Sequence, residues 1–388
     1  MKKILTLLLL ALFATTGSCK AESKTAPIGF AKKAKSNSPV VHNKHFIKVA
    51  LLLDTSNSMD GLIDQAKAQL WEIVNELSYA RCQSERPELK IALYEYGNDG
   101  LNDKSGFIRQ VLNFTGDLDE ISKELFSLTT NGGSEYCGQV IQTSLNELEW
   151  GKDADDLKMV FIAGNEPFTQ GKVSYKDAAT NAKEKDVVVN TIFCGDYQQG
   201  IRSYWKDGAD LTYGDYMAIN HNQRTVHIAS PYDDMILQLN LRLNKTYVPY
   251  GQIGIDKMEV QSSQDANAEE LSKANAVSRT VSKGSHLYKN STWDLVDAES
   301  EADFDYKDLD KSSLPAELKG KSTQEIKDYV AKKKAARVEI QSEIQKLNEQ
   351  RRTYIASNKK ETGTNLESAM IEAIKKQAKK KNYTWDKN

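Results

Sequence analysis

The stretch FIKVALLLDTSNS, residues 46–58, decides the fold class of this chain. It begins as a nearly continuous apolar run, which is typical of a parallel strand whose two faces are both covered by helices. The run ends at Asp54, and apolar residues at helical spacing follow over residues 60–80. We therefore expect a buried strand, a polar turn and an amphipathic helix, the first unit of an α/β sheet.

The same alternation continues to about residue 250. Strands are predicted in the apolar runs at 89–96, 107–114, 158–163 and 187–194, and a last strand or hairpin at 215–229. The run at 107–114 alternates between apolar and polar residues, as an edge strand does. The predicted fold is α/β, a doubly wound and mostly parallel six-stranded sheet flanked by helices. Ligands of such sheets bind where loops leave the carboxyl ends of the strands.

The turn after the first strand offers ligands for a hard metal ion. Residues two apart on an extended turn point the same way, so the carboxylate of Asp54 and the hydroxyls of Ser56 and Ser58 should converge. Such oxygen ligands suit Mg²⁺, with Mn²⁺ or Ca²⁺ as alternatives, better than zinc or copper. A helix cap without metal is the other interpretation, because Asp and Ser are common caps.

The Asp-x-Ser-x-Ser pattern at 54–58 resembles the metal-ion-dependent adhesion site of von Willebrand factor A-type domains. A second motif, Gly132-Gly133-Ser134-Glu135, matches the loop that supplies another hydroxyl in that family. The resemblance covers residues 46–250, implies the doubly wound fold, and makes Ser134 the third hydroxyl ligand.

The third motif of the family departs from its pattern here. The family usually has Thr-Asp-Gly after its fourth strand, whereas this chain has Gly164-Asn165-Glu166, so a glycine stands where the carboxylate belongs. Asn165 or Glu166 could approach the ion instead, and Glu135 could replace the lost charge.

The resemblance implies metal-dependent protein binding, in adhesion, assembly or a scaffold of the bacterial cell envelope. A partner's Asp or Glu would complete the coordination shell of the ion, because the protein fills only part of an octahedron. On this interpretation the chain is not an enzyme and has no catalytic residues. Two alternatives stay open: a structural module with a degenerate metal site, and a metal-dependent hydrolase whose base would be Glu135 or Glu166.

The N-terminus resembles an export signal. Lys2 and Lys3 precede a ten-residue apolar stretch, and small residues lead to Cys19. We expect residues 1–19 to be a lipoprotein-type signal peptide with Cys19 as the lipidated residue, although Thr16 replaces the usual Leu. The alternative is plain secretion. Residues 20–45 read as a flexible tether, so the protein is expected in the periplasm or at the cell surface, lipid-anchored to a bacterial membrane.

Three further cysteines follow the tether, Cys82, Cys137 and Cys194. Cys137 should open a helix and Cys194 should end a strand on the rim that carries the metal loops. A Cys137–Cys194 disulfide is therefore the one sensible pair, and three small buried thiols are the alternative.

Composition excludes several other classes. The chain has 388 residues and a net charge of -2, so it is not an electrostatic nucleic-acid binder as a whole. Motifs of nucleotide-binding loops, serine esterases and zinc proteases do not occur in the sequence.

Residues 251–388 read as a helical C-terminal extension. Ala266 to Val281 could form an amphipathic helix, and Ser322-x-x-Glu325 is a capping box that opens a long helix over 322–355. This helix has a coiled-coil heptad frame, but Lys333, Arg337 and Arg351 lie in its seam. A helical hairpin packed on the domain or on a partner fits better than a self-sufficient coiled coil.

Overall fold

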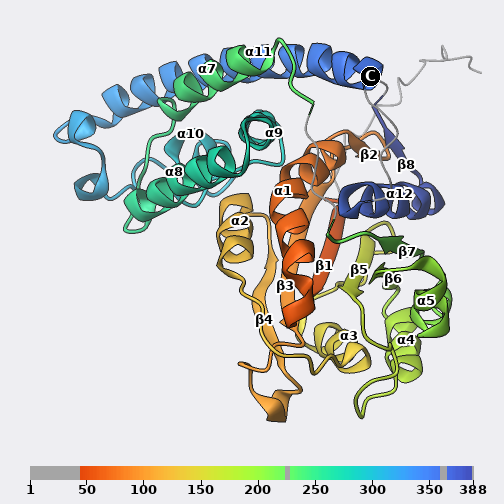
Figure 1. The fold of residues 1–388 in the computed structure, drawn as a ribbon. Helices are drawn as coiled ribbons and strands as arrows, with labels where there is room; N and C mark the ends of the chain where they lie inside the picture. The colour runs from red at the N-terminus through yellow and green to blue at the C-terminus, as the bar shows by residue number, and fades with distance from the viewer. Residues whose placement is uncertain (1–43, 223–227, 359–364, 387–388) are drawn as a thin grey trace, which may run out of the picture. The chain divides into compact units, whose positions relative to one another are not determined.

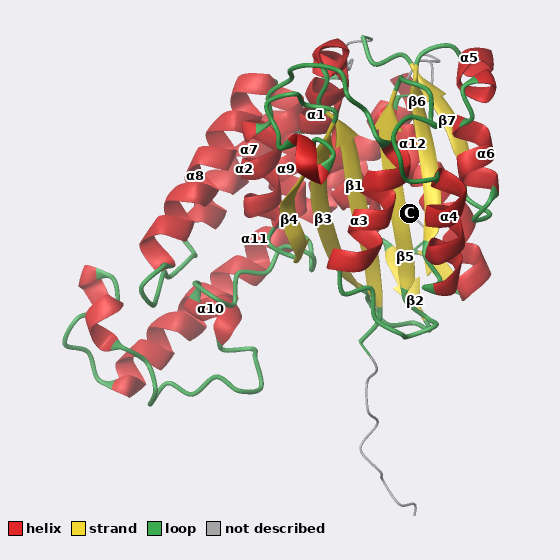
Figure 2. Ribbon diagram, turned by 90° about the horizontal axis from the view of Figure 1, so that it is seen from below, coloured by secondary structure: helices red, strands yellow, loops and turns green. Residues whose placement is uncertain are grey.

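A computed structural model describes residues 44–222, 228–358 and 365–386 of the chain. Its centre is a six-stranded sheet in the order β4-β3-β1-β5-β6-β7 (Figures 1 and 2). The pairings β1–β3, β1–β5, β5–β6 and β6–β7 are parallel, and only β4, at one edge, is antiparallel to its neighbour β3. The six-stranded, mostly parallel sheet and the edge position of the strand predicted at 107–114, which is β4, are confirmed.

The elements have the following bounds. The sheet contains β1 (Phe46–Asp54), β3 (Glu88–Tyr96), β4 (Ile108–Thr115), β5 (Leu157–Gly164), β6 (Val188–Cys194) and β7 (Tyr216–Ile219). The helices up to the last strand are α1 (Asp60–Leu77), α2 (Leu118–Ser127), α3 (Cys137–Glu147), α4 (Tyr175–Glu184), α5 (Tyr197–Arg202) and α6 (Trp205–Asp210). The later helices are α7 (Asp233–Asn244), α8 (Gly254–Leu271), α9 (Lys273–Lys283), α10 (Leu295–Ala298), α11 (Thr323–Asn358) and α12 (Leu366–Ala378). A second sheet pairs β2 (Ala80–Cys82) with β8 (Tyr383–Trp385).

The first strand is buried on both faces because helices cover both. Successive side chains of a strand point to opposite faces, so Leu51 and Leu53 pack in one core while Ala50 and Leu52 pack in the other. The first core lies between the sheet and α1, α2 and α12, and the second between the sheet and α3, α4 and α6. This double burial is the reason that β1 reads as a continuous apolar run.

The end of the chain belongs to the first core. In α12, Met370 and Ile374 are buried against the same cluster as α1, and the helix lies beside α1 and against β5, β6 and β7 (Figure 1). Tyr383 of β8 is buried there too, and its hydroxyl donates to the carbonyl of Asp155 at 3.0 Å. Residues more than 300 positions after β1 therefore complete the cover of the sheet on this side.

The long helix begins at Thr323, directly after Ser322 of the proposed capping box, and ends at Asn358, three residues beyond the predicted end. Ser322 N donates to Glu325 Oε2 at 2.8 Å, and Glu325 N donates to Ser322 Oγ at 3.3 Å, so the capping box is present. The seam arginine Arg337 is buried and donates to Asp294 Oδ2 at 2.6 Å and to Asp297 Oδ1 at 2.9 Å. The face of α11 that carries these charged residues packs against α7, α9 and α10 of the same chain, as expected for packing on the domain.

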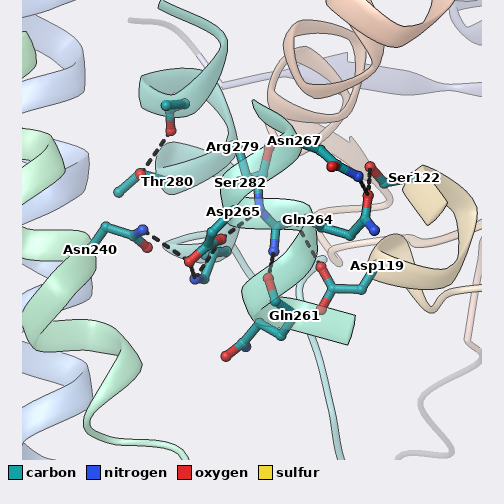
Figure 3. A network of polar contacts seen from close by, with 12 residues as sticks. Asp119, Ser122, Asn240, Gln261, Gln264, Asp265, Asn267, Arg279, Thr280 and Ser282 are labelled. Atoms are coloured by element: carbon teal, nitrogen blue, oxygen red, sulfur yellow. Dashed lines mark hydrogen bonds and ion pairs between the residues drawn. The ribbon is translucent and has the colours of Figure 1, made fainter. Parts of the chain in front are cut away.

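A buried polar network joins α2 to α8 and α9 (Figure 3). The guanidinium of Arg279 is only 1% exposed; it donates to Asp119 Oδ1 at 2.7 Å and to Asp265 Oδ1 at 2.6 Å. Lys283, also buried, donates to Asp265 Oδ2 at 2.9 Å. Although burial opposes it, the charges of Arg279 and Lys283 lower the pKa of Asp265. Each of these buried charges lies beside an opposite charge, which offsets the cost of its burial.

Two local expectations differ from the structure. The single helix expected over Ala266–Val281 is two helices, because Ser272 ends α8 in an extended conformation and caps α9 by accepting from Asn275 N at 3.1 Å. The strand or hairpin expected over 215–229 is the short parallel strand β7, and residues 223–227 lie outside the described part. The signal peptide, Cys19 and residues 20–43 of the tether also lie outside it. In the described ranges, no helix is long and apolar enough to cross a membrane.

Candidate metal centre

The turn after β1 is held in shape by its own backbone and by Asp54. The carboxylate of Asp54 is fully buried, and its Oδ1 accepts from Ser56 N at 2.7 Å. The hydroxyl oxygens of Ser56 and Ser58 lie 3.3 Å apart, so the residues two apart do converge. Ser56 precedes a short 3-10 helix (Asn57–Met59), yet its side chain makes no capping hydrogen bond. The Ser56 hydroxyl is therefore not used as a helix cap.

Backbone hydrogen bonds join the second loop to the first. Asn57 N donates to Gly132 O at 3.0 Å, and Asn131 N donates to Thr55 O at 2.9 Å. Ser134 forms an isolated bridge with Gly97, directly after β3. Asp54 pairs with Tyr96, the residue before Gly97, in the parallel ladder. Half-buried Ser134 therefore lies near Asp54, at the carboxyl ends of β1 and β3.

The third loop approaches through Asn165. Asn165 Nδ2 donates to Ser58 Oγ at 3.1 Å, and its Oδ1 is buried without a hydrogen-bond partner. Glu166 is positioned differently: its backbone N donates to Glu135 Oε2 at 3.3 Å, while its carboxylate accepts from Gln170 Nε2 at 3.1 Å. The structure therefore brings Asp54, Ser56, Ser58 and Asn165 together, and turns the Glu166 carboxylate toward Gln170.

The glycine at position 164 is required by the packing around it. A Cβ added to Gly164 would lie 2.5 Å from Tyr96 Oη and 3.0 Å from Asp54 Oδ2. Tyr96 is fully buried and donates from Oη to the carbonyl of Ala163 at 3.0 Å. The Tyr96 hydroxyl and the Asp54 side chain occupy the room that a side chain at 164 would need, so the family carboxylate cannot be accommodated here.

Glu135 supplies a carboxyl group beside Asp54 instead. It is 2% exposed, and a Cβ on the neighbouring Gly97, whose φ is +81°, would lie 2.8 Å from both Asp54 Oδ1 and Glu135 Cγ. Burial, followed by the hydrogen bond with Asp54, raises the pKa of Glu135; burial also raises the pKa of Asp54. Two carboxyl groups this close share a proton unless a cation takes its place.

The donor set fits a hard divalent cation. Asp54 Oδ2 is buried without a hydrogen-bond partner, at the junction of the three loops. An orphaned buried carboxylate oxygen is costly, and a bound cation would satisfy it. The described residues contain no group of three or more His, Cys, Asp or Glu side chains that could hold a metal. A site here would therefore depend on serine hydroxyls as well as carboxylates.

Of the two alternatives for the cysteines, the structure has buried free thiols. Cys82, Cys137 and Cys194 are all unpaired. The expected Cys137–Cys194 disulfide is absent because Cys194 belongs to the core on the α1 face and Cys137 to the core on the α3 face. The two residues share the rim, but the sheet separates their side chains.

Tyr96 is the site residue that the sequence did not indicate. It lies in an apolar strand and reads as core, and only its contact with Gly164 gives it a part in the site. The glycine in place of the family Asp was the one available signal. That signal told us that a carboxylate was lost, without telling us what occupies its room.

Comparison with known proteins identifies the sheet domain. Residues 48–202 match the family model of the von Willebrand factor type A domain, so the chain contains such a domain. No curated protein sequence matches the chain.

Three solved structures illustrate the fold-level likeness. The protein BatB from Bacteroides thetaiotaomicron shares 16% identity over 45% of this chain and 90% of its own, with a TM-score of 0.34. Proximal thread matrix protein 1 from the mussel byssus, solved with a zinc-occupied metal site, shares 12% over 46% of this chain, with a TM-score of 0.36. The match spans 43% of that mussel protein. The SpRpn10 VWA domain shares 14% over 47% of this chain and 99% of its own, with a TM-score of 0.34.

Proposed function

We propose that the von Willebrand factor type A domain of this chain, which spans residues 48–202, binds a divalent cation and through it a carboxylate of a partner protein. Asp54, Ser56, Ser58 and Ser134 would hold the ion, with Asn165 nearby, and Mg²⁺ is the expected metal. The observation that carries the proposal is the buried Asp54 Oδ2, which has no hydrogen-bond partner although it belongs to the turn where the Ser56 and Ser58 hydroxyls converge.

Glu135 supports this assignment in place of the family Asp. Loss of the carboxylate at 164 would leave the ion with one fewer negative charge, but Glu135 adjoins Asp54 and restores that charge. Glu166 would act from farther out, since its carboxylate accepts a hydrogen bond from Gln170. The number of carboxylates near the ion then stays low, and the ion keeps its attraction for an incoming Asp or Glu.

The hydroxyl ligands support binding rather than hydrolysis. A hydrolase would need a general base with access to the ion and to a substrate. Glu135 is 2% exposed and Glu166 is engaged with Gln170, so neither carboxylate stands free beside the loops. The proposed role is therefore reversible, metal-dependent protein binding, by an exported and lipid-anchored protein of the bacterial envelope.

Calorimetry on the full chain tests the metal site. We expect Mg²⁺ and Mn²⁺ to bind the wild type and to give no heat with Asp54→Ala, which removes the buried carboxylate. Asp64→Ala is the matched control, because Asp64 is an exposed aspartate on α1, and it should bind metal as the wild type does. Absence of metal binding by the wild type would leave only the structural module.

Partner binding is tested separately, by capture from envelope extracts with Mg²⁺ and with EDTA. A partner that wild type and Asp64→Ala retain in Mg²⁺, and that EDTA or Asp54→Ala releases, is the expected result. A partner retained equally by Asp54→Ala contradicts recognition through the ion. Alanine substitution of the acidic residues of the identified partner then tests which carboxylate it supplies.

A further inference from the structure

A cavity lies at the amino ends of the parallel strands, whereas Asp54 lies at the carboxyl end of β1. It has a volume of about 330 Å³ and opens beside the first residues of β5 and β6, the turn after α6, and the short helix η5 (Lys379–Lys381) that follows α12. Its apolar walls come from Leu157, Met159, Val187 and Val188. This size is within the range of small-molecule sites, and mostly apolar walls with a few polar groups are typical of them.

The charges that line the cavity are unbalanced. Four lysines and one aspartate contribute: Lys158, Lys183, Lys380, Lys381 and Asp186. Asp186 is already paired with two of these lysines, because Lys381 Nζ lies 2.6 Å and Lys158 Nζ lies 4.0 Å from its Oδ2. Lys183 and Lys380 are exposed, and neither has a carboxylate partner within the described ranges. Two ammonium groups are thus left for an anion.

Tyr213, at the rim of this cavity, has a backbone conformation that is unfavourable for a tyrosine. It follows α6 in the left-handed conformation with φ of +59°, and Gly214 N closes the turn on Ala209 O at 3.0 Å. Glycine is the usual residue in that conformation after a helix, and a bulky side chain there is strained. The Tyr213 ring is 71% exposed, so the core gains nothing from it. Lys183 Nζ lies 5.0 Å from the ring centroid, which directs the ammonium and the ring to the same opening.

We propose that this cavity binds a small amphipathic anion, a carboxylate or phosphate monoester carried on an aliphatic or aromatic body. Lys183 and Lys380 receive the anionic group, the apolar walls take the body, and Tyr213 covers it. Apolar walls disfavour a bare inorganic anion, and two unpaired ammonium groups disfavour a neutral or cationic body. The cavity lies at the amino ends of the strands, so its binding is independent of the metal site.

Calorimetry of the full chain with 4-phenylbutyrate tests the proposal. Binding in the range up to about 1 mM is expected, with no heat from inorganic phosphate and at least about tenfold weaker binding of 4-phenylbutyramide, which lacks the charge. The double variant Lys183→Gln/Lys380→Gln should lose at least about tenfold in affinity. Lys332→Gln/Lys346→Gln, which removes the same charge from exposed lysines of α11, should bind as the wild type does.

Tyr213→Gly separates a ligand-binding role from a structural one. It removes the ring and the strain together, so affinity for 4-phenylbutyrate should fall while the melting temperature stays the same or rises. A lower melting temperature with unchanged affinity would overturn the role of the ring. Equal binding of acid and amide, no change in the lysine double variant, or no heat at about 10 mM 4-phenylbutyrate would overturn the proposal itself.

Discussion

Arg279 donates from Nη1 to Asp119 Oδ1 at 2.7 Å, across 160 positions of sequence and with both side chains at most 4% exposed. The pair joins α9, in the C-terminal third, to α2 of the sheet domain (Figure 3). Removal of one partner from a buried ion pair leaves the other charge without compensation. The contact therefore makes the C-terminal helices part of the stability of the domain.

Arg279→Met should lower the free energy of unfolding by about 3–5 kcal/mol, because Asp119 and Asp265 lose their shared partner. Urea unfolding of the full chain measures this loss. Arg202→Met is the control, because Arg202 is exposed and no ion pair of the described residues includes it, and it should stay within about 0.5 kcal/mol of the wild type. A loss under about 1 kcal/mol for Arg279→Met would mean that the network adds little stability.

Gly164→Ala should destabilise the chain by about 1–3 kcal/mol and weaken metal binding, because the added Cβ meets Tyr96 Oη. Gly133→Ala is the matched control, since a Cβ there meets nothing within 4 Å and its φ is not positive. Tyr96→Phe removes the hydroxyl and should restore part of the loss in the double variant. Thermal unfolding and calorimetry measure both effects; equal losses at 164 and 133 would contradict the steric argument.

The Asp54–Glu135 pair should contribute less to the stability of the metal-free chain as pH rises. Burial raises the pKa of Asp54 to about 6, and burial together with the neighbouring Asp54 carboxyl raises the pKa of Glu135 to about 9, from ordinary values of 3.8 and 4.5. The folded chain therefore binds more protons than the unfolded chain between about pH 4 and 9. The contribution of this pair is complete below pH 4 and is lost toward pH 9.

Melting temperatures from pH 5 to 9, in EDTA and in saturating Mg²⁺, measure this dependence. Mg²⁺ should flatten the curve, and its binding at neutral pH should release a proton that calorimetry in two buffers detects. Glu135→Gln should flatten the EDTA curve, whereas Glu149→Gln, at an exposed position, should leave it unchanged. An EDTA curve of Glu135→Gln with the same slope as that of the wild type would contradict the assignment of a shared proton.

Met370→Ala should cost about 2–5 kcal/mol, although it lies 18 residues from the end of the chain, because Met370 is 3% exposed in the core between α1 and the sheet. Ile371→Ala, at the adjacent half-buried position of α12, should cost less. Urea unfolding distinguishes the two. Equal small losses would mean that α12 is not required to cover the sheet.

The cysteines of the folded chain should not react with a thiol reagent at neutral pH. Burial raises the pKa of the thiols of Cys137 and Cys194, and thiolates are the reactive form. In a Cys19→Ser variant, three thiols should become reactive in denaturant without reductant. If only one thiol reacts in denaturant, Cys137 and Cys194 form a disulfide, contrary to the structure.

The sequence indicated much of the fold because the evidence is local. Burial on both faces makes β1 a continuous apolar run, and Asp117 accepts from Glu120 N at 3.0 Å at the start of α2, a capping contact between residues three apart. The convergence of Ser56 and Ser58 also follows from spacing alone. These features are set by neighbours in the chain.

Contacts between distant residues could not be read in the same way. Nothing near Met370 in sequence indicates that it packs under α1, and nothing near Gly164 indicates that Tyr96 fills the room beside it. By itself the sequence determined the order of strands and helices along the chain and the first turn of the proposed metal site, since periodicity and spacing carry that information. Only the tertiary structure decided that Glu135 adjoins Asp54, that the cysteines face different cores, and that the last helix completes the domain, because these depend on which side of the sheet each segment packs against.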